Sequence, residues 1–250
     1  ILLHSYAAWS CLPGAARRRV TVSAGHSLGE FTAYLTAGAI EFEDAVRLVR
    51  RRGELMGRAG TVRPGTMAAV IGLDPEAVQA VCSGVSAGRV VPANYNAPGQ
   101  IVISGDVDAV EVAMERALEA GAKRAVRLNV SGAFHSPLMA EARDGLALAL
   151  EDVQVRDPDF PVVANAAAIP VMRAARAGEL LVEQLTSPVR WVECVRSMIE
   201  TEPDAWFEVG PGKVLTGLMR RIDRTITVRP IGGPEDLDEV ESFLEEADDA

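Results

Sequence analysis

Cysteine is scarce in this sequence, and long apolar runs are missing. The three cysteines, Cys11, Cys82 and Cys194, are widely spaced without a metal-binding pattern, and an odd number in a chain of 250 residues argues against a disulfide framework. Charged residues or glycine interrupt each apolar run before the roughly 18 residues of a transmembrane helix. No secretory signal peptide is recognisable. We therefore expect a cytoplasmic protein with no metal centre and no membrane partner.

Positive charge is also in short supply. The chain has 25 Lys and Arg against 35 Asp and Glu, so its formal net charge is −10. This balance argues against nucleic acid as a partner. Aromatic residues make up only 5% of the chain and hydrophobic residues 48%, a composition typical of α/β enzymes rather than of fibrous or disordered chains.

The pattern of apolar residues predicts one domain inserted into another. Between residues 65 and 128 it predicts strand, helix, strand, strand, helix and strand, the βαββαβ order of the ferredoxin-like module. Helices and short strands alternate on both sides of this stretch. We therefore predict an α/β fold whose hydrolase-like core, with a parallel sheet, is built from residues 1–62 and 129–250. Residues 63–128 are predicted to form an inserted ferredoxin-like subdomain.

The sharpest local motif runs from Gly25 to Gly29 and has the spacing Gly-x-Ser-x-Gly. It lies between a predicted strand (20–24) and a predicted helix (31–37), which is the context of a nucleophile elbow. The two glycines permit a tight turn that exposes the Ser27 hydroxyl, and the start of the next helix favours negative charge beside it. We predict Ser27 as a nucleophile and the backbone N–H of Leu28 as an oxyanion donor.

A serine nucleophile needs a base, and the sequence offers only three histidines. His4 lies in the predicted first helix. His26 adjoins the serine, so its side chain should point away and is better suited to the wall of a pocket. His135 lies in the loop 131–137 that leads out of the inserted module. A lone loop histidine often has no catalytic role, but elimination makes His135 the candidate base.

A helical wheel for residues 43–58 places Arg52 on the apolar face and Arg47, Arg50 and Arg51 elsewhere. An arginine buried in such a face needs an anion, because desolvating an unpaired charge is costly. The anion is either an Asp or Glu of the fold or a carboxylate of the substrate, which a guanidinium can bind with two parallel hydrogen bonds. The wheel leaves both interpretations open.

On these residues the chain resembles the malonyl-CoA:acyl carrier protein transacylases and the related acyltransferase domains of polyketide and fatty acid synthases. The resemblance covers nearly the whole chain. The motifs that carry it are Gly25-His26-Ser27-Leu28-Gly29-Glu30, Asp44-Ala45-Val46-Arg47-Leu48-Val49 with Arg51-Arg52-Gly53, Ala93-Asn94-Tyr95-Asn96-Ala97-Pro98-Gly99-Gln100, Gln184-Leu185 with Pro188-Val189 and Trp191, and Glu208-Val209-Gly210-Pro211-Gly212-Lys213-Val214-Leu215-Thr216-Gly217-Leu218.

The resemblance implies transfer of a malonyl group from malonyl-CoA to the phosphopantetheine thiol of an acyl carrier protein, through a malonyl-serine intermediate, in fatty acid or polyketide synthesis. It implies Ser27 as nucleophile, His135 as general base and acid, and Arg52 as the ligand of the malonyl carboxylate. The main-chain carbonyl of Gln184 would hold the second nitrogen of the histidine. Malonyl-CoA is then a substrate, no cofactor is expected, and we expect a monomer.

Three further residues are expected in the pocket. The segment Gly132-Ala133-Phe134 is similar to the pattern of malonyl-preferring polyketide enzymes, in which a bulky Phe disfavours an α-methyl group. One methyl group contributes only about 1–3 kcal/mol of discrimination, so this selectivity should be modest. His26 and Asn96 are expected beside Phe134.

Basic residues cluster at positions 17–19, 123–124 and 220–221 despite the acidic balance of the chain. Such clusters are either ordinary solvated surface or a dock for an acidic carrier protein or for the phosphates of coenzyme A.

The resemblance also implies a segment that this sequence does not contain. Members of the family begin with a strand and a Gln/Gly-rich loop whose backbone N–H completes the oxyanion hole, and no such segment precedes Ile1. Losing one such donor typically lowers the rate by about 10²–10³. We therefore expect either that the sequence is part of a longer protein or that this stretch alone is poorly active.

A serine hydrolase, an esterase or thioesterase, is the main alternative because it shares the elbow. Such an enzyme would have a histidine near its C-terminus, but here no histidine follows His135. A patatin-like hydrolase would need an Asp-Gly-Gly or Asp-Gly-Ala segment, which the sequence lacks. A third interpretation is a docking module without enzymatic activity, for which substitution of Ser27 would have no effect.

Overall fold

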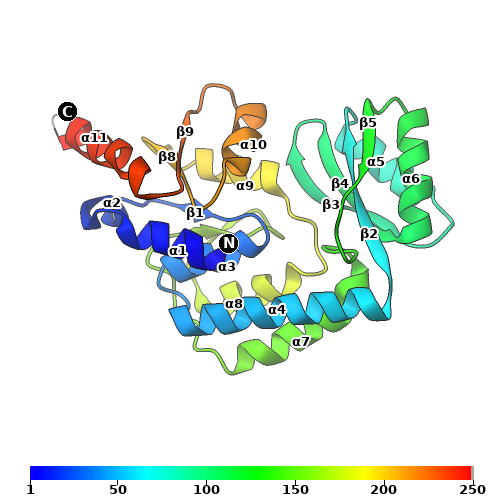
Figure 1. Cartoon of the computed structure of the whole chain (residues 1–250), viewed down its shortest axis with the longest axis horizontal. Helices are drawn as coiled ribbons and strands as arrows, with labels where there is room; N and C mark the ends of the chain where they lie inside the picture. The colour runs from blue at the N-terminus through cyan, green and yellow to red at the C-terminus, as the bar shows by residue number, and fades with distance from the viewer. Residues whose placement is uncertain (249–250) are drawn as a thin grey trace.

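Two lobes make up the mixed α/β structure, a computed structural model that describes residues 1–248 (Figure 1). The larger lobe contains the helices α1 (Leu2–Cys11), α2 (Gly14–Arg18), α3 (Leu28–Thr36), α4 (Phe42–Val62), α7 (Ala140–Glu151), α8 (Ala174–Glu183), α9 (Trp191–Ile199), α10 (Val214–Ile222) and α11 (Leu237–Asp248), the 3-10 helices η1 (Pro137–Met139) and η2 (Pro234–Asp236), and the strands β1 (Ser23–Ala24), β6 (Val162–Val163), β7 (Pro170–Val171), β8 (Trp206–Val209) and β9 (Val228–Ile231). The smaller lobe contains β2 (Gly65–Ile71), α5 (Pro75–Ser83), β3 (Val90–Ala97), β4 (Gln100–Asp106), α6 (Val107–Glu119) and β5 (Arg124–Arg127).

The smaller lobe is built on a four-stranded antiparallel sheet in the order β3-β4-β2-β5. Its strands and helices follow one another in the order that the apolar pattern predicted. Residues of β2 alternate between the two faces, as the pleat of a strand requires. Ala68 and Val70 pack against α5 and α6. Met67 points to the opposite face, where it belongs to the same apolar cluster as Phe134, so this face meets the loop that carries the candidate base.

The sheets of the larger lobe are small. Strand β1 pairs in parallel with β6, β7 joins β6 antiparallel, and β8 and β9 form a separate parallel pair. The predicted parallel sheet is therefore found only in part, and the turn after β6 explains the difference. The N–H of Ala164 donates to the carbonyl of Ile169 at 3.0 Å, and Ala168 has a φ of 55°. A parallel neighbour needs a connection of about a dozen residues, so this short turn returns the chain antiparallel.

The core of the larger lobe lies where α3, α4, α7 and α8 pack together. Helix α4 is amphipathic, and its buried face contains Leu48, Arg52 and Met56. The helical wheel predicted this position of Arg52. The charged side chain of Arg52 is thus enclosed by the apolar core and is only 5% exposed. Such an arrangement is stable only when the polar atoms of the side chain have partners.

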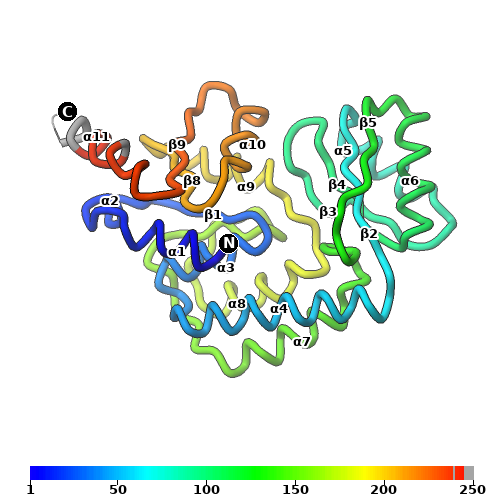
Figure 2. Tube along the Cα trace, in the orientation of Figure 1, coloured from blue at the N-terminus to red at the C-terminus, as the bar shows by residue number. Residues whose placement is uncertain are grey.

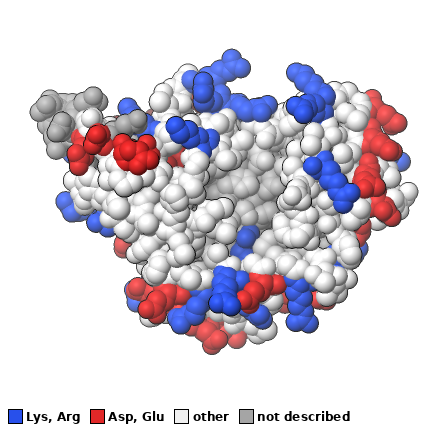
Figure 3. Space-filling view, viewed as in Figure 1, with Lys and Arg blue, Asp and Glu red and all other residues white. Residues whose placement is uncertain are grey.

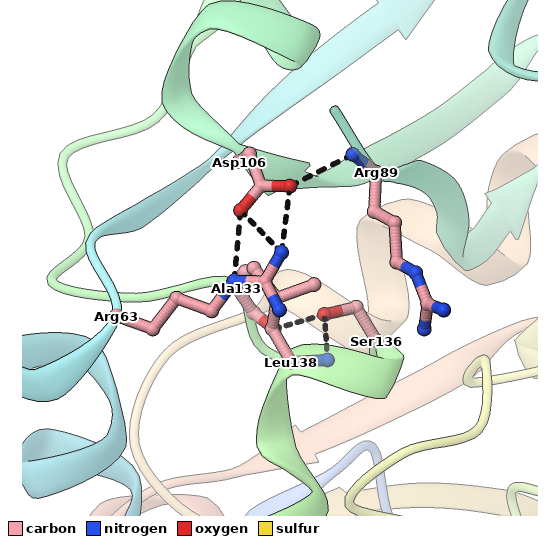
Figure 4. A network of polar contacts seen from close by, with 6 residues as sticks. All are labelled: Arg63, Arg89, Asp106, Ala133, Ser136 and Leu138. Carbon is pink, nitrogen blue, oxygen red and sulfur yellow. Dashed lines mark hydrogen bonds and ion pairs between the residues drawn. The ribbon is translucent and has the colours of Figure 1, made fainter. Parts of the chain in front are cut away.

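The chain passes from the larger to the smaller lobe after α4 and returns after β5 (Figure 2). At the first crossing, Nε and Nη2 of Arg63 donate to the carboxylate of Asp106 at 3.0 Å, and the N–H of Arg89 donates to the same carboxylate at 2.7 Å (Figure 4). At the return, the Ser136 hydroxyl donates to the carbonyl of Ala133 at 2.6 Å. These contacts hold the two crossings in place, and the contact at the return joins residues on either side of the candidate base.

A second junction joins the lobes through their backbones. The N–H of Tyr95, in β3, donates to the carbonyl of Val189 at 2.9 Å, and the N–H of Val189 donates to the carbonyl of Ala93 at 2.8 Å. The smaller lobe is therefore attached both at the crossings and along one edge of its sheet.

None of the helices within residues 1–248 combines the length and the apolar character needed to cross a membrane.

Candidate active site

The turn between β1 and α3 presents Ser27 in a strained backbone conformation. Its φ is 52° and its ψ −106°, a region that residues with a side chain rarely adopt. Gly25 permits the turn, because a Cβ at that position would lie 2.0 Å from the backbone of Gly29. Leu28 is the first residue of α3, so its N–H is among those that find no partner within the helix. A hydroxyl and a free N–H thus share one helix start, as a nucleophile elbow requires.

Asn165, which follows β6, holds this turn from the side. Its Oδ1 accepts the N–H of Ser27 at 2.7 Å, and its Nδ2 donates to the carbonyl of Gly25 at 2.9 Å. The side chain is fully buried. Asn165 was not predicted from the sequence; the signal available was a polar residue that follows a short apolar segment.

His135 lies next to the serine. Its Nε2 is 2.8 Å from Oγ of Ser27, and its Nδ1 is 2.9 Å from the main-chain carbonyl of Gln184. A carbonyl can only accept, so Nδ1 carries the proton and Nε2 is free to accept the serine hydroxyl. Burial and the charge of Arg52 lower the pKa of His135 from 6.5 to about 3. The imidazole is therefore neutral near pH 7, the state in which it can act as a base.

Arg52 completes the group around the hydroxyl. Its Nη2 donates to Oγ of Ser27 at 2.8 Å and to Oε1 of Gln184 at 3.2 Å. Burial lowers the pKa of Arg52 from 12.5 to about 10, and the nearby Glu30 opposes this shift. Its Nε is buried without a hydrogen-bond partner among the described residues. The guanidinium is thus charged and has an unused donor, as expected where an anionic ligand can bind.

Gln184 contributes more than the backbone carbonyl that the sequence predicted. Its Nε2 donates to the carbonyl of Ser27 at 3.1 Å and to Oε2 of Glu30 at 2.6 Å. Glu30, in the first turn of α3, is fully buried, and burial raises its pKa from 4.5 to about 7. Glu30 belongs to the elbow motif, but no role for it could be predicted from the sequence, because its partners Asn165 and Gln184 lie far away in the chain.

His26, Asn96 and Phe134 lie around this group. Nε2 of His26 and Oδ1 of Asn96 are 2.8 Å apart, which bridges the elbow and strand β3 of the other lobe. The ring of His26 also packs against Trp191, with centroids 5.5 Å apart, and burial lowers the pKa of His26. Phe134 is partly buried and contacts apolar clusters of both lobes. The side chain of His26 therefore contacts Asn96 and Trp191, as expected for a histidine that points away from the serine.

The surface is hollowed between the two lobes, and lysine and arginine side chains stand around the upper rim of this hollow (Figure 3). The basic residues predicted at 123–124 and 220–221 are all exposed. Within residues 1–248, His, Cys, Asp and Glu form no group of three or more that could hold a metal ion. The site thus offers a hydroxyl, a neutral imidazole and a guanidinium, a set suited to acyl transfer through serine.

Comparison with known proteins identifies the family. The model described as the acyl transferase domain matches residues 5–231. The chain belongs to the acyl transferase domain family. The resemblance inferred from the motifs is thereby confirmed.

Two curated relatives of this acyltransferase chain are the malonyl CoA-acyl carrier protein transacylases of Bacillus subtilis strain 168 and Escherichia coli K12. The chain is 44% identical to the first over 231 residues, which cover 91% of this chain and 73% of the relative. It is 44% identical to the second over 212 residues, which cover 84% of this chain and 69% of the relative.

Solved structures are similar to this acyltransferase chain over almost its whole length. The acyl-carrier-protein S-malonyltransferase of Bartonella henselae has a TM-score of 0.91 at 40% identity and covers 98% of this chain and 79% of its own. A malonyl-transacylase in complex with its type II polyketide acyl-carrier protein has a TM-score of 0.90 at 41% identity and covers 95% and 77%.

Proposed function

We propose that this chain transfers a malonyl group from malonyl-CoA to the phosphopantetheine thiol of an acyl carrier protein, in fatty acid or polyketide synthesis. One observation carries the proposal: the Ser27 hydroxyl lies 2.8 Å from both Nε2 of His135 and Nη2 of Arg52. A nucleophile with its base is common to serine enzymes, whereas a buried arginine on the same hydroxyl favours a substrate that carries a carboxylate. The names of the similar proteins support the same substrate and partner.

In the first half-reaction, Nε2 of His135 takes the proton of the Ser27 hydroxyl as Oγ attacks the thioester carbonyl. The negative charge that develops on the carbonyl oxygen is stabilised by the N–H of Leu28 and the start of α3. When the intermediate collapses, the C–S bond breaks, and the coenzyme A thiolate takes the proton from His135. Ser27 is left as a malonyl ester.

In the second half-reaction, His135 takes the proton of the carrier thiol, whose sulfur attacks the malonyl ester. Collapse breaks the bond to Oγ, and His135 returns the proton to Ser27. The carbonyl of Gln184 keeps the imidazole oriented and stabilises its protonated form in both steps. Water must be kept from the ester while it waits for the thiol.

Arg52 binds the malonyl carboxylate in this proposal. Of the two partners that the helix left open, a carboxylate of the fold is disfavoured, because Arg52 donates its hydrogen bonds to Ser27 and Gln184 rather than to Glu30. The positive charge of the guanidinium is then available to the substrate. Phe134 beside the site is proposed to disfavour an α-methyl group to a modest extent.

The division of the chain into subdomains and the surface that receives the carrier protein are also proposed. The strand order β3-β4-β2-β5, with both helices on one face, supports a ferredoxin-like subdomain of residues 63–128 inserted into a hydrolase-like core. The exposed basic residues at 123–124 and 220–221 are proposed to receive the acidic carrier protein or the phosphates of coenzyme A. The monomeric state and the cytoplasmic location stay predictions.

Intact-mass measurement tests the proposed function. Incubation of the protein with malonyl-CoA should add one malonyl group, and peptide mapping should place it on Ser27. Ser27→Ala should stay unlabelled under the same conditions. A serine hydrolase would instead release free malonate without a lasting adduct, and an unlabelled protein that releases none would favour the docking module.

A further inference from the structure

The carboxylate of Glu30 is buried in the first turn of α3 and has two hydrogen-bond donors on one oxygen. Nε2 of Gln184 donates to its Oε2 at 2.6 Å, and the backbone N–H of Asn165 donates to the same atom at 3.0 Å. The other oxygen, Oε1, has no hydrogen-bond partner among the described residues. Burying a carboxylate costs free energy. A role for Glu30 that offsets this cost should therefore depend on Oε2, the oxygen that has hydrogen-bond partners.

Glu30 is the nearer of the two acceptors that face the amide nitrogen of Gln184; the other is the carbonyl of Ser27, at 3.1 Å. The amide nitrogen of Gln184 faces an acceptor, Oε2 of Glu30, and the amide oxygen faces a donor, Nη2 of Arg52, at 3.2 Å. If the amide were turned by 180°, its oxygen would face the carboxylate and its nitrogen would face the guanidinium. Both contacts would then be repulsive, because a carboxylate only accepts and a guanidinium only donates.

The carboxylate of Glu30 is connected to Arg52, His135 and Ser27, in each case through one intervening residue. Gln184 accepts Nη2 of Arg52 with its side chain and Nδ1 of His135 with its main-chain carbonyl. Asn165, whose N–H is held by Glu30, accepts the N–H of Ser27. Of these connections, the one through the side-chain amide of Gln184 depends most directly on Glu30. Only this amide can be turned by 180°, because the other contacts use backbone groups.

We propose that Glu30 is a positioning residue for the malonyl carboxylate: it fixes the amide of Gln184 so that the amide oxygen orients Arg52. The inference rests on the proposed function, because it concerns the group that Arg52 binds. Loss of the acceptor at position 30 leaves the Gln184 amide nitrogen with only the longer 3.1 Å contact to the carbonyl of Ser27, so the amide turns its nitrogen toward Arg52 more readily and the guanidinium is displaced. Loading of Ser27 from a malonyl donor then suffers more than loading from an acetyl donor, which has no carboxylate.

The test compares Glu30→Met and Glu30→Gln in the purified protein. Rates of Ser27 loading are measured with malonyl-CoA and acetyl-CoA, and their ratio is the readout. Glu30→Met removes the acceptor and should lower the malonyl-to-acetyl ratio about tenfold, the loss expected when one charge-assisted hydrogen bond is disturbed. Glu30→Gln keeps a carbonyl oxygen for Gln184 and Asn165 and should keep the ratio within about threefold.

Glu208 supplies a matched control, because it is another carboxylate that accepts backbone N–H groups. It accepts those of Leu215 and Thr216 at 2.9 and 2.7 Å and caps α10. Glu208→Met should lower the melting temperature and leave the malonyl-to-acetyl ratio unchanged. If the role of Glu30 were purely structural, Glu30→Met would likewise lower the melting temperature and leave the malonyl-to-acetyl ratio unchanged.

Gln184→Met provides an independent route should Glu30→Met fail to fold. It keeps the main-chain carbonyl that holds His135 and removes the amide, so it should lower the ratio as Glu30→Met does, and the double variant should lower it no further. Equal losses with both donors in Glu30→Met or Gln184→Met, or additive losses in the double variant, would overturn the positioning role. Absence of label on the unsubstituted protein with malonyl-CoA would instead overturn the proposed function itself.

Discussion

The hydroxyl of Ser27 and the imidazole of His135 lie 2.8 Å apart, and both residues have a left-handed backbone, with φ of 52° and 56°. Residues other than glycine adopt this region only at an energetic cost, so the surrounding structure must hold them there. Asn165 holds the backbone of Ser27, and the carbonyl of Gln184 holds the ring of His135. The strain is located where the hydroxyl and the imidazole meet.

Arg52→Ala should lower Ser27 loading from malonyl-CoA about a hundredfold and loading from acetyl-CoA far less. The physical reason is that the malonyl carboxylate loses charge-assisted hydrogen bonds of about 1.5–3 kcal/mol each. Rates of label uptake with the two donors provide the measurement. Arg51→Ala is the control, because Arg51 lies on the same helix, is exposed and makes only a 3.7 Å contact with Glu54. Equal losses with both donors would remove the carboxylate contact from the mechanism.

The rate of Ser27 loading from acetyl-CoA, which does not need the carboxylate contact, should depend little on pH between 7.5 and 5.5. An ordinary histidine, with a pKa of 6.5, would be protonated to about nine tenths at pH 5.5 and lost as a base. Burial and the charge of Arg52 lower the pKa of His135 to about 3, so its neutral form persists over this range. The measurement is the pH profile of loading under first-order conditions, where the free enzyme is monitored.

The pH profile of Arg52→Gln tests the electrostatic cause. Removing the positive charge should raise the pKa of His135, so the acidic limb of the profile should move to higher pH. Acetyl-CoA is the donor in this comparison, because it does not need the carboxylate contact. A limb that stays in place would show that burial alone sets the pKa.

Gly60→Ala should destabilise the protein by about 1–3 kcal/mol, as overpacking does, and should slow Ser27 loading. A Cβ at this position would lie 2.2 Å from the carbonyl of Ser131, so the loop that carries His135 would have to move. Gly57→Ala, in the same helix with no heavy atom within 4 Å of the new Cβ, should instead stabilise by up to about 1 kcal/mol. Urea denaturation and loading rates measure both effects; a Gly60→Ala protein as active as Gly57→Ala would contradict the account.

Several features could be predicted from the sequence because their causes are local. The order of strands and helices between residues 65 and 128 follows from apolar periodicity over adjacent residues. The position of Ser27 follows from two glycines within a turn, and the burial of Arg52 from the helical wheel of α4. His135 was reached by elimination, which was possible because the chain has so few histidines, and the structure places it beside Ser27.

The elements that were missed include β9, the twelve-residue helix α11 and two shorter elements. The two-residue strand β7 and the five-residue helix α2 contain too few residues for a periodic pattern to emerge. The antiparallel direction of β7 depends on a turn stabilised by its own backbone hydrogen bond, which the pattern of apolar residues does not encode.

The sequence by itself therefore determined the family, the order of the elements between residues 65 and 128 and the candidate reacting groups. The tertiary structure decided how those groups are held and how they titrate. Asn165 is 138 residues from Ser27, and Gln184 is 154 residues from Glu30, so no local pattern could pair them. The low pKa of His135 likewise comes from burial and from a charge on another element. Both effects depend on distance in space, which a linear sequence does not contain.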